Sequence, residues 1–477
     1  MGQGQSLHYP GELMNVLPLG LGGCTLGVVV LLLLLRGLPL SRGVRWLALA
    51  LWAGGCLVVT LAGIPLVSVV GALLAGVFVA LARPVGALGV LLGLLIVRPW
   101  EMPGGEVLQS MPRLFALCTL LSVGVALLRG RVSGLYVTRS TVWFALLISW
   151  FLLATLGAAG PTYLGTVELG NFIPMTILFL LIPSVVVAPD DSVLMKEVFV
   201  VAVVGAVTAA LFTPRVPLPG GGDFARLTGS GLFGNSNDLA ALIAVALAFV
   251  LVPRIGGVSR QLTVVELAMG AILVVGLWLT QSRGAIIGLV VGALLVAVTG
   301  RLRRWSYLLV PLIGCMLVLF FLSVRREEVD LATSQSSRWN YVIAGARMAK
   351  AHPLFGVGME NYPRLYERYT PAFDEWGERT AHSSWILALA ETGLPGLLLL
   401  VAFYLSVLRA AWRIRSFAPE YLGMFVTYGV VMSFLSHTYT LLPYLLGALV
   451  LAAARGQSGA ALRSGRRVAQ QEAAVCF

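Results

Sequence analysis

The chain has 477 residues, of which 58% are hydrophobic and only 11% are charged, and its mean hydropathy is +0.91. A soluble domain has about a quarter of its residues charged, so this composition excludes a water-soluble globular protein. The formal net charge of +12 comes largely from short loops between apolar runs, which favours a membrane-topology signal over nucleic-acid binding.

Long uninterrupted apolar runs follow one another along the chain. A transmembrane helix needs about 20 mostly apolar residues, whereas a strand of a membrane β-barrel shows about 10 residues of alternating polarity. The run GVVVLLLLL at 27–35 has no such alternation. The sequence therefore predicts an all-α polytopic membrane protein with roughly 12 to 15 transmembrane helices. The expected spans lie near 16–35, 46–62, 64–82, 85–98, 114–128, 141–158, 172–188, 195–213, 237–253, 264–281, 285–299, 307–323, 384–408, 421–437 and 439–454.

Six short segments are basic and contain no acidic residue, which is typical of cytoplasmic loops under the positive-inside rule. They are 36–45, 129–139, 254–260, 300–304, 409–415 and 455–467. If Arg254 and Arg260 are inside, alternation of the later spans places one set of polar residues on the outer face. This set is Arg215, Arg226, Arg283, the segment 324–383 with His382, and His437.

The spans and loops divide the chain into five expected segments. N-terminal helices cover 1–213, and core helices with candidate anion-binding arginines cover 214–323. A large outer loop covers 324–383, C-terminal helices cover 384–454, and an inner tail covers 455–477.

The outer loop 324–383 has eight basic and eight acidic residues, so its charge does not make it a cytoplasmic anchor. Apolar residues at helical spacing predict a helix that Ser336 or Ser337 caps and that His352-Pro353 ends. The glycines of 355–358 then predict a turn. The loop is therefore expected to be ordered.

Arg283, in TQSRGAIIG, lies between two apolar runs with almost no loop between them. An arginine at this position is costly if it faces lipid, so we expect it to face a cavity or an anionic partner. Snorkelling of the long side chain to lipid phosphates is the alternative.

The stretch 226–238, RLTGSGLFGNSND, runs directly into an apolar span. Backbone N–H groups at a helix start favour an anion, so Arg226 and Asn237 are candidates for anion binding. Ordinary capping of the helix by Asn235 or Asn237 explains the same residues.

Arg338 lies at the start of the amphipathic part of the outer loop and is a candidate for anion binding. The alternative is that it belongs to a charged, solvated face of the predicted helix. Several arginines on one face together favour binding of a lipid diphosphate, because guanidinium groups engage phosphate oxygens bidentately. The chain has no GxxxxGK[ST] loop. Arginines in place of a metal ion are therefore the simpler prediction for neutralising the diphosphate.

His382, in ERTAHSSW, lies where the outer loop meets an apolar span. A histidine at such a boundary is often only a hydrogen-bonding partner. A neutral imidazole can also remove a proton from a sugar hydroxyl, and a diphosphate held by arginines is a good leaving group. His382 is therefore the candidate catalytic base, and His437, in SHTYT, is a second and weaker candidate.

Four blocks of the sequence, within about 220–400, resemble the bacterial O-antigen ligase and O-antigen polymerase superfamily. They are RLTGSGLFGNSNDLA, LTQSRGAIIGL, SSRWNYVIAGARMAKAHPLFGVGMENY and AHSSWILALAETGLPGLL. Two positions depart from the family pattern. Asn235-Ser236-Asn237 stands for Asn-Pro-Asn, and Ser383 stands where asparagine often follows the histidine. Neither change removes a charged group.

The resemblance implies a metal-independent, inverting glycosyltransferase with a GT-C-like membrane fold. It would act at the periplasmic face of the bacterial inner membrane on an undecaprenyl-diphosphate-linked glycan. By position it implies that Arg226, Arg283 and Arg338 bind the diphosphate and that His382 is the catalytic base. Arg215, Arg98, His437 and Asn237 are weaker candidates, and neither a metal nor a cofactor is expected.

The sequence leaves the acceptor open. It could be the lipid A core for a ligase, a growing glycan for a polysaccharide polymerase, or a protein hydroxyl for an O-oligosaccharyltransferase. A transporter of lipid-linked glycans is the competing class, but it predicts charged residues at mid-depth in the spans, and few are present.

Overall fold

The computed structural model describes residues 10–36, 42–158, 163–213, 226–229, 234–255, 264–299, 328–371 and 380–457. These residues form helices and turns, and no strand occurs among them. The predicted span 307–323 and the candidate Arg215 lie outside the described residues.

Among the described residues, seven helices are long and apolar enough to cross a membrane by length and composition. They are Leu17–Leu35, Pro65–Ala82, Pro84–Glu101, Glu106–Leu128, Arg139–Gly157, Pro189–Leu211 and Ser384–Arg413. Shorter apolar helices accompany them, among them Ser236–Val252, Val264–Thr280, Arg283–Thr299 and Leu441–Gln457. The predicted all-α polytopic membrane fold is confirmed.

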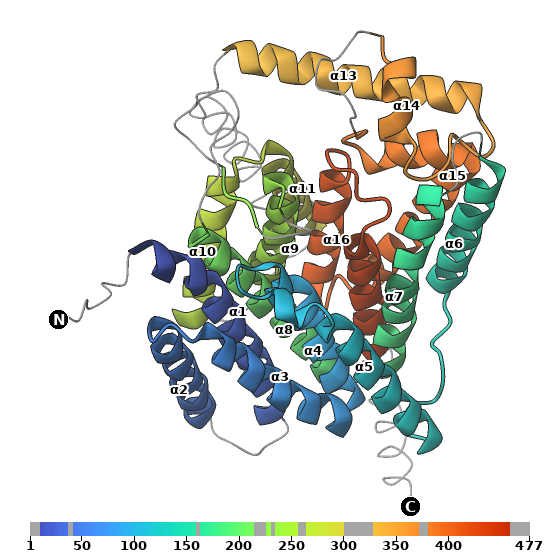
Figure 1. The fold of residues 1–477 in the computed structure, drawn as a ribbon. Coiled ribbons are helices and arrows are strands. Elements are labelled where there is room, and N and C mark those ends of the chain that lie inside the picture. Colours follow the sequence, from blue (N-terminus) through green and yellow to red (C-terminus); the bar gives the residue numbers. More distant parts are fainter. Residues whose placement is uncertain are drawn as a thin grey trace, which may run out of the picture. The chain divides into compact units, whose positions relative to one another are not determined.

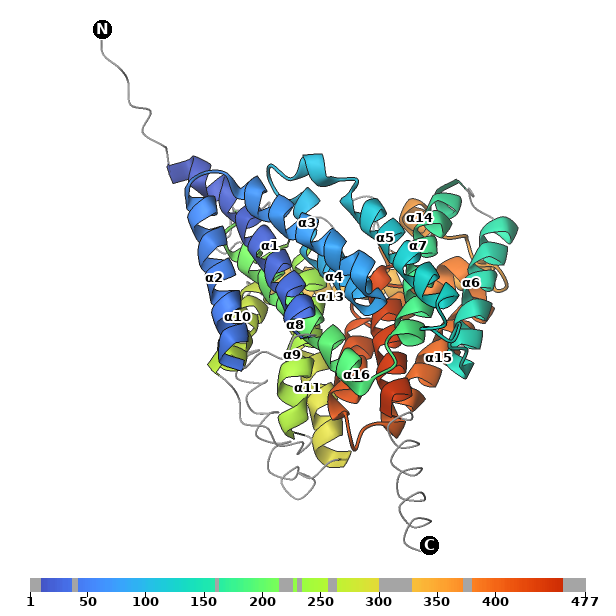
Figure 2. The ribbon, with the colours of Figure 1, turned by 90° about the horizontal axis from the view of Figure 1, so that it is seen from below.

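The first of two compact units contains residues 1–134, 189–250 and 260–282. Its helices are α1 (Pro10–Leu35), α2 (Arg42–Leu61), α3 (Pro65–Ala82), α4 (Pro84–Val97), α5 (Met111–Leu128), α8 (Pro189–Leu211), most of α9 (Ser236–Ile255) and α10 (Val264–Thr280). Helix α1 packs against α2 and α3, as both ribbon views show (Figures 1 and 2). Small residues allow this approach: a Cβ on Gly23 would lie 2.7 Å from the backbone nitrogen of Val69.

The second unit contains residues 135–188, 251–259 and 283–477. Its helices are α6 (Arg139–Gly157), α7 (Tyr163–Val185), α11 (Arg283–Thr299), α13 (Glu328–Ala351), α14 (Tyr362–Tyr369), α15 (Ser384–Arg413), α16 (Pro419–Val431) and the last apolar helix, Leu441–Gln457. Aromatic rings from α6, α7, α15 and the last helix form its core. The rings of Phe144 and Phe179 lie 4.2 Å apart between centroids, and Phe403 and Tyr444 lie 5.7 Å apart.

Helix α11 packs closely along α16 because it presents a glycine on every fourth residue. A Cβ on Gly288 would lie 2.7 Å from the carbonyl oxygen of Thr427, and one on Gly284 would lie 2.9 Å from the ring of Phe434. Gly292 meets the backbone of Gly423 in the same way. Small residues at this spacing let two helices approach until their backbones touch.

Two sequence expectations are wrong in detail. Helix α13 begins at Glu328, so Ser336 and Ser337 lie inside it and neither is at its start. The expected span 421–437 is too long, because α16 ends at Val431 and turns occupy 432–440. The predicted end of α13 is confirmed, since the helix stops at Ala351, directly before His352-Pro353.

Helices α13 and α14 pack together beside the start of α15 (Figure 1). Helix α15 is not continuous, because Gly393 adopts φ 70° and ψ −176° and Pro395 follows it. This kink divides α15 into a short first part, which carries the contacts to α13 and α14, and a longer second part.

Candidate functional site

His382 lies two residues before the first residue of α15, half-buried, with a left-handed backbone at φ 46°. Few residues other than glycine adopt this conformation, and it persists only where neighbouring contacts hold it. The imidazole ring lies against the ring of Tyr341 on α13, with centroids 5.3 Å apart. Ser383 follows as the N-cap, and its Oγ accepts the N–H of Ile386. The backbone and one ring face of His382 are therefore fixed by neighbouring structure.

Ser384 joins the start of α15 to the turn at 432–438. Its backbone N–H donates to the carbonyl oxygen of Met432 (2.8 Å), and its Oγ donates to the carbonyl oxygen of Leu435 (2.7 Å). The same Oγ accepts the backbone N–H of His437 (2.9 Å), and the Ser384 carbonyl accepts the Thr438 hydroxyl (2.7 Å). These four bonds hold the backbone and the side chain of Ser384, and Ser384 is only two residues after His382.

His437, the second histidine candidate, is buried within this turn. Its Nδ1 lies 2.9 Å from the hydroxyl of Tyr428, and its ring stacks on the Tyr428 ring. These contacts place His437 among the groups that hold the start of α15.

Tyr341, which contacts His382, is itself supported by α14. The Tyr362 hydroxyl donates to the Tyr341 carbonyl oxygen at 2.6 Å, and the ring of Tyr366 lies 5.4 Å from that of Tyr341. Burial raises the pKa of the Tyr362 hydroxyl well above its usual range, so it remains a neutral donor at physiological pH. Tyr341 therefore packs against His382, and Tyr362 and Tyr366 of α14 support Tyr341.

Glu391, on α15, is a buried carboxylate to which the sequence reasoning gave no role. Its Oε1 accepts the backbone N–H of Tyr362 (2.8 Å), the first residue of α14, and the Tyr439 hydroxyl lies beside it. The signal was present in the sequence, because an acidic residue inside an apolar span indicates a specific partner. Glu391 therefore joins α14 to α15.

The glycine turn predicted for 355–358 lies against the kink of α15. Val357 donates its N–H to the carbonyl oxygen of Ala390 (2.9 Å), and Gly358 donates to that of Glu391 (3.0 Å). Gly356 has φ 69°, and a Cβ on it would collide with the backbone of Glu391. The turn needs glycine for both its backbone angle and this close approach.

Arg283 is the first residue of α11 and is partly buried. The next residue, Gly284, lies against Phe434. Phe434 belongs to the same 432–438 turn that Ser384 anchors to α15. The structure therefore brings the start of α11, with Arg283, and the start of α15, with His382, to one short segment of the second unit.

Arg338 lies on α13 and is exposed. It is three residues before Tyr341, and residues at this spacing are neighbours on a helix surface. Arg338 therefore lies one turn from the tyrosine that contacts His382.

Arg226 and Asn237 belong to the first unit and contact each other. The Arg226 guanidinium donates to the carbonyl oxygens of Thr280 (2.9 Å) and Gln281 (3.2 Å) and to Oδ1 of Asn237 (3.3 Å). Thr280 and Gln281 are the residues that precede Ser282 and Arg283 in the chain. The predicted cap is confirmed at Asn235, whose Oδ1 accepts the Asn237 N–H (2.9 Å).

Arg98, also in the first unit, forms an ion pair with Glu101 and lies 5.5 Å from the centre of the Trp100 ring. Its backbone is left-handed, with φ 50°, at the end of α4. The Glu101 carboxylate neutralises much of the Arg98 charge, which makes Arg98 a weaker candidate for anion binding.

A known protein family matches part of the chain. No curated protein matches the chain. The model of the O-antigen ligase family matches residues 268–401, which include Arg283, Arg338, His382 and the glycine turn. Residues 268–401 are therefore similar to the O-antigen ligase family, within a chain whose apolar helices are those of a multi-pass membrane protein.

Proposed function

We propose that the protein is an inverting glycosyltransferase of the bacterial inner membrane. It moves a glycan from undecaprenyl diphosphate to an acceptor hydroxyl at the periplasmic face. His382 is the base, and Arg226, Arg283 and Arg338 hold the diphosphate. Arg215 and Arg98 are weaker candidates for the same anion, and Asn237 orients Arg226 through its hydrogen bond.

One observation carries the proposal: the starts of α11 and α15 share the 432–438 turn. Gly284, next to Arg283, lies against Phe434, and Ser384, two residues after His382, is bonded to Met432 and Leu435. A cation and an imidazole at one end of one unit supply the two functions that glycosyl transfer needs. These are neutralisation of a leaving group and removal of a proton from the acceptor.

The reaction follows from these two functions. The His382 imidazole takes the proton of the acceptor hydroxyl as the acceptor oxygen attacks the anomeric carbon of the donor. The bond from that carbon to the diphosphate oxygen breaks, and the electron pair leaves with undecaprenyl diphosphate. Guanidinium groups stabilise the charge that develops on the diphosphate. Attack from the face opposite the leaving group inverts the anomeric carbon.

Transfer by the purified protein from a lipid-diphosphate donor tests this proposal. His382→Ala should lower the rate by about 10²- to 10⁴-fold, the usual contribution of a general base. His352→Ala is the matched control, because His352 lies in the same loop, 324–383, but 11 residues after Tyr341. Its Nε2 lies 3.3 Å from the Tyr369 hydroxyl. Transfer by His382→Ala at the wild-type rate would contradict the assignment. Excess EDTA should leave the wild-type rate unchanged.

The acceptor is decided by the glycans of a deletion strain. In the ligase form of the proposal, long chains are missing from lipid A and accumulate on the carrier. In the polymerase form, single repeat units remain on their acceptor. In the protein O-oligosaccharyltransferase form, lipid A keeps its long chains and a glycoprotein loses its glycan.

A further inference from the structure

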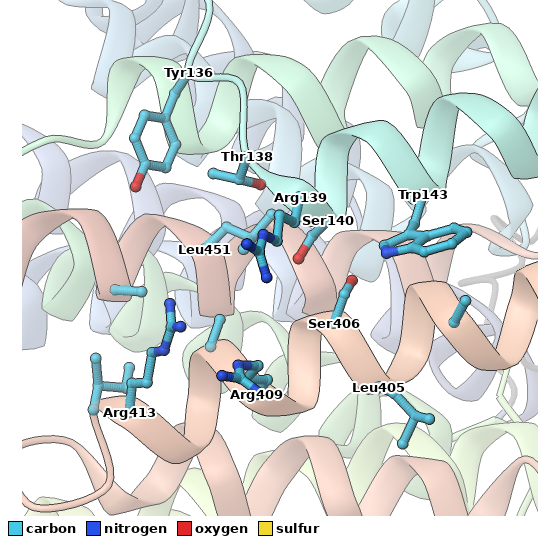
Figure 3. Close-up of a pocket in the computed structure, with 14 residues that line it drawn as sticks. Tyr136, Thr138, Arg139, Ser140, Trp143, Leu405, Ser406, Arg409, Arg413 and Leu451 are labelled. Atoms are coloured by element: carbon cyan, nitrogen blue, oxygen red, sulfur yellow. The ribbon is translucent and has the colours of Figure 1, made fainter.

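A pocket of about 720 Å³ lies in the second unit, at the C-terminal end of α15. The start of α6 and the last turns of α15 form its walls, and Leu451 of the last helix completes it (Figure 3). Three of its residues are arginines, Arg139 on α6 and Arg409 and Arg413 on α15. Neither the family match nor the proposed glycosyl transfer assigns it a ligand.

The pocket concentrates positive charge. Arg409 and Arg413 are four residues apart on α15 and therefore lie on one helix face, and Figure 3 shows Arg139 directed at them from α6. None of the 14 lining residues is acidic. Among the described residues, no carboxylate forms an ion pair with these three arginines. Like charges held together in this way repel each other, and a bound anion relieves that repulsion.

Hydroxyl groups lie among the arginines. Ser140 and Ser406 contribute side chains to the pocket, and both are drawn beside Arg139 and Arg409 in Figure 3. Guanidinium and hydroxyl donors around one volume suit the oxygens of a phosphate.

The wall nearer the middle of α15 is apolar. Leu405 lies one turn before Arg409, and Trp143 and Leu451 face the same pocket from α6 and the last helix. Tryptophan is common at the level of lipid headgroups, where one side of the ring contacts hydrocarbon. A pocket that has arginines on one side and apolar side chains on the other suits a molecule with a phosphate and an acyl chain.

The pocket cannot belong to the candidate site around His382. The kink at Gly393 separates the start of α15 from its second part. Arg409 is 14 residues after Pro395 in that second part, which at about 1.5 Å per residue is roughly 20 Å along a helix. The two sites therefore lie at different ends of α15, and one diphosphate cannot occupy both.

We propose that this pocket binds the phosphate headgroup of an anionic glycerophospholipid in the leaflet where α15 ends. Arg139, Arg409 and Arg413 contact the phosphate, and Leu405 and Trp143 contact the first part of an acyl chain. The positive-inside rule places this end of α15 on the cytoplasmic side, where anionic lipids attract basic residues at helix ends.

Native mass spectrometry of the purified full chain, titrated with phosphatidylglycerol, tests the proposal. Wild type should retain one tightly bound lipid, and Arg409→Gln combined with Arg413→Gln should weaken its binding by about tenfold or more. Arg415→Gln is the matched control. Arg415 lies at the same helix end but stacks on Trp412 at 4.3 Å and does not line the pocket. This control should bind the lipid as wild type does.

Three outcomes would overturn the proposal. The first is equal binding by wild type and the double variant, with both shown by gel filtration to be folded. The second is equal binding of phosphatidylcholine, which would show that the headgroup charge is not recognised. The third is displacement of the lipid by inorganic phosphate at millimolar concentration, which would identify a free-phosphate site.

Discussion

The two ends of α15 differ in how their polar groups are used. At the first end, Ser384 forms hydrogen bonds to the 432–438 turn, and Glu391 bonds the start of α14. At the last end, Arg409 and Arg413 are exposed around an open pocket. One end is fixed by intramolecular bonds, and the other has charged side chains exposed at the surface.

This difference matches what each end is proposed to do. A reacting group must be held close to its productive geometry, and a displacement of about 1 Å can reduce a rate about 100-fold. A lipid headgroup is bound by charge and tolerates more movement of long side chains. Substitutions at the first end of α15 are therefore expected to change stability, and substitutions at the last end are expected to change only binding.

Gly356→Ala should have the largest effect on stability. The residue has φ 69°, and the added Cβ would collide with the backbone of Glu391, which cannot rotate away. Left-handed strain and overpacking together should destabilise the fold by about 3 kcal/mol. Thermal unfolding in detergent measures the loss. Gly447→Ala is the matched control, since its nearest neighbour would be an ordinary contact at 3.4 Å; equal melting temperatures for the two variants would contradict the account of this turn.

Glu391→Ala should have the next largest effect on the stability of the fold. It removes the acceptor of the Tyr362 N–H, and a buried donor left unsatisfied costs about 1–3 kcal/mol. Glu391→Gln keeps an oxygen at Oε1 and should cost less. Hydrogen exchange at the Tyr362 amide reports the bond directly. It should accelerate in the alanine variant and remain slow in the glutamine variant, and equal exchange in both would show that the bond does not hold α14.

Arg409→Gln with Arg413→Gln should have the smallest effect on unfolding. Both side chains are exposed and form no ion pair with another described residue. Substitution of such side chains changes the free energy of unfolding by less than about 0.5 kcal/mol, so the melting temperature in a neutral detergent should not change. Addition of phosphatidylglycerol should raise the melting temperature of wild type and not of this variant. A large loss of stability in detergent alone would show that the last end of α15 is structurally fixed as well.

Apolar runs bounded by charges and prolines allowed most helices of the two units to be predicted from the sequence. The expected span 285–299 is α11 from Arg283 to Thr299, and α15 begins at the expected residue, Ser384. The outer segment was expected to be ordered, and it contains α13 and α14. Composition and periodicity determine these features locally, so one sequence is enough.

The features that depend on tertiary contacts could not be predicted in the same way. The kink at Gly393 lies in a mostly apolar run next to Glu391 and Pro395, and the contact with Pro353, whose carbonyl accepts the Leu394 N–H, supports it from outside the helix. The anchoring role of Ser384 needs the 432–438 turn, which lies 48 to 54 residues later in the sequence. The roles of Arg226, Arg283, Arg338 and His382 remain predictions, because they concern a bound donor.

Donor affinity and single-turnover transfer, measured together for His382→Ala and Arg283→Gln, test the central claim most directly. We expect His382→Ala to bind the lipid-diphosphate donor as wild type does and to lose transfer by about 10²- to 10⁴-fold. Arg283→Gln should weaken donor binding by about tenfold or more, because a charge-assisted bond to phosphate is lost. If His382→Ala weakens donor binding as much as Arg283→Gln and transfers bound donor at the wild-type rate, the division of roles between base and diphosphate-binding arginine is wrong.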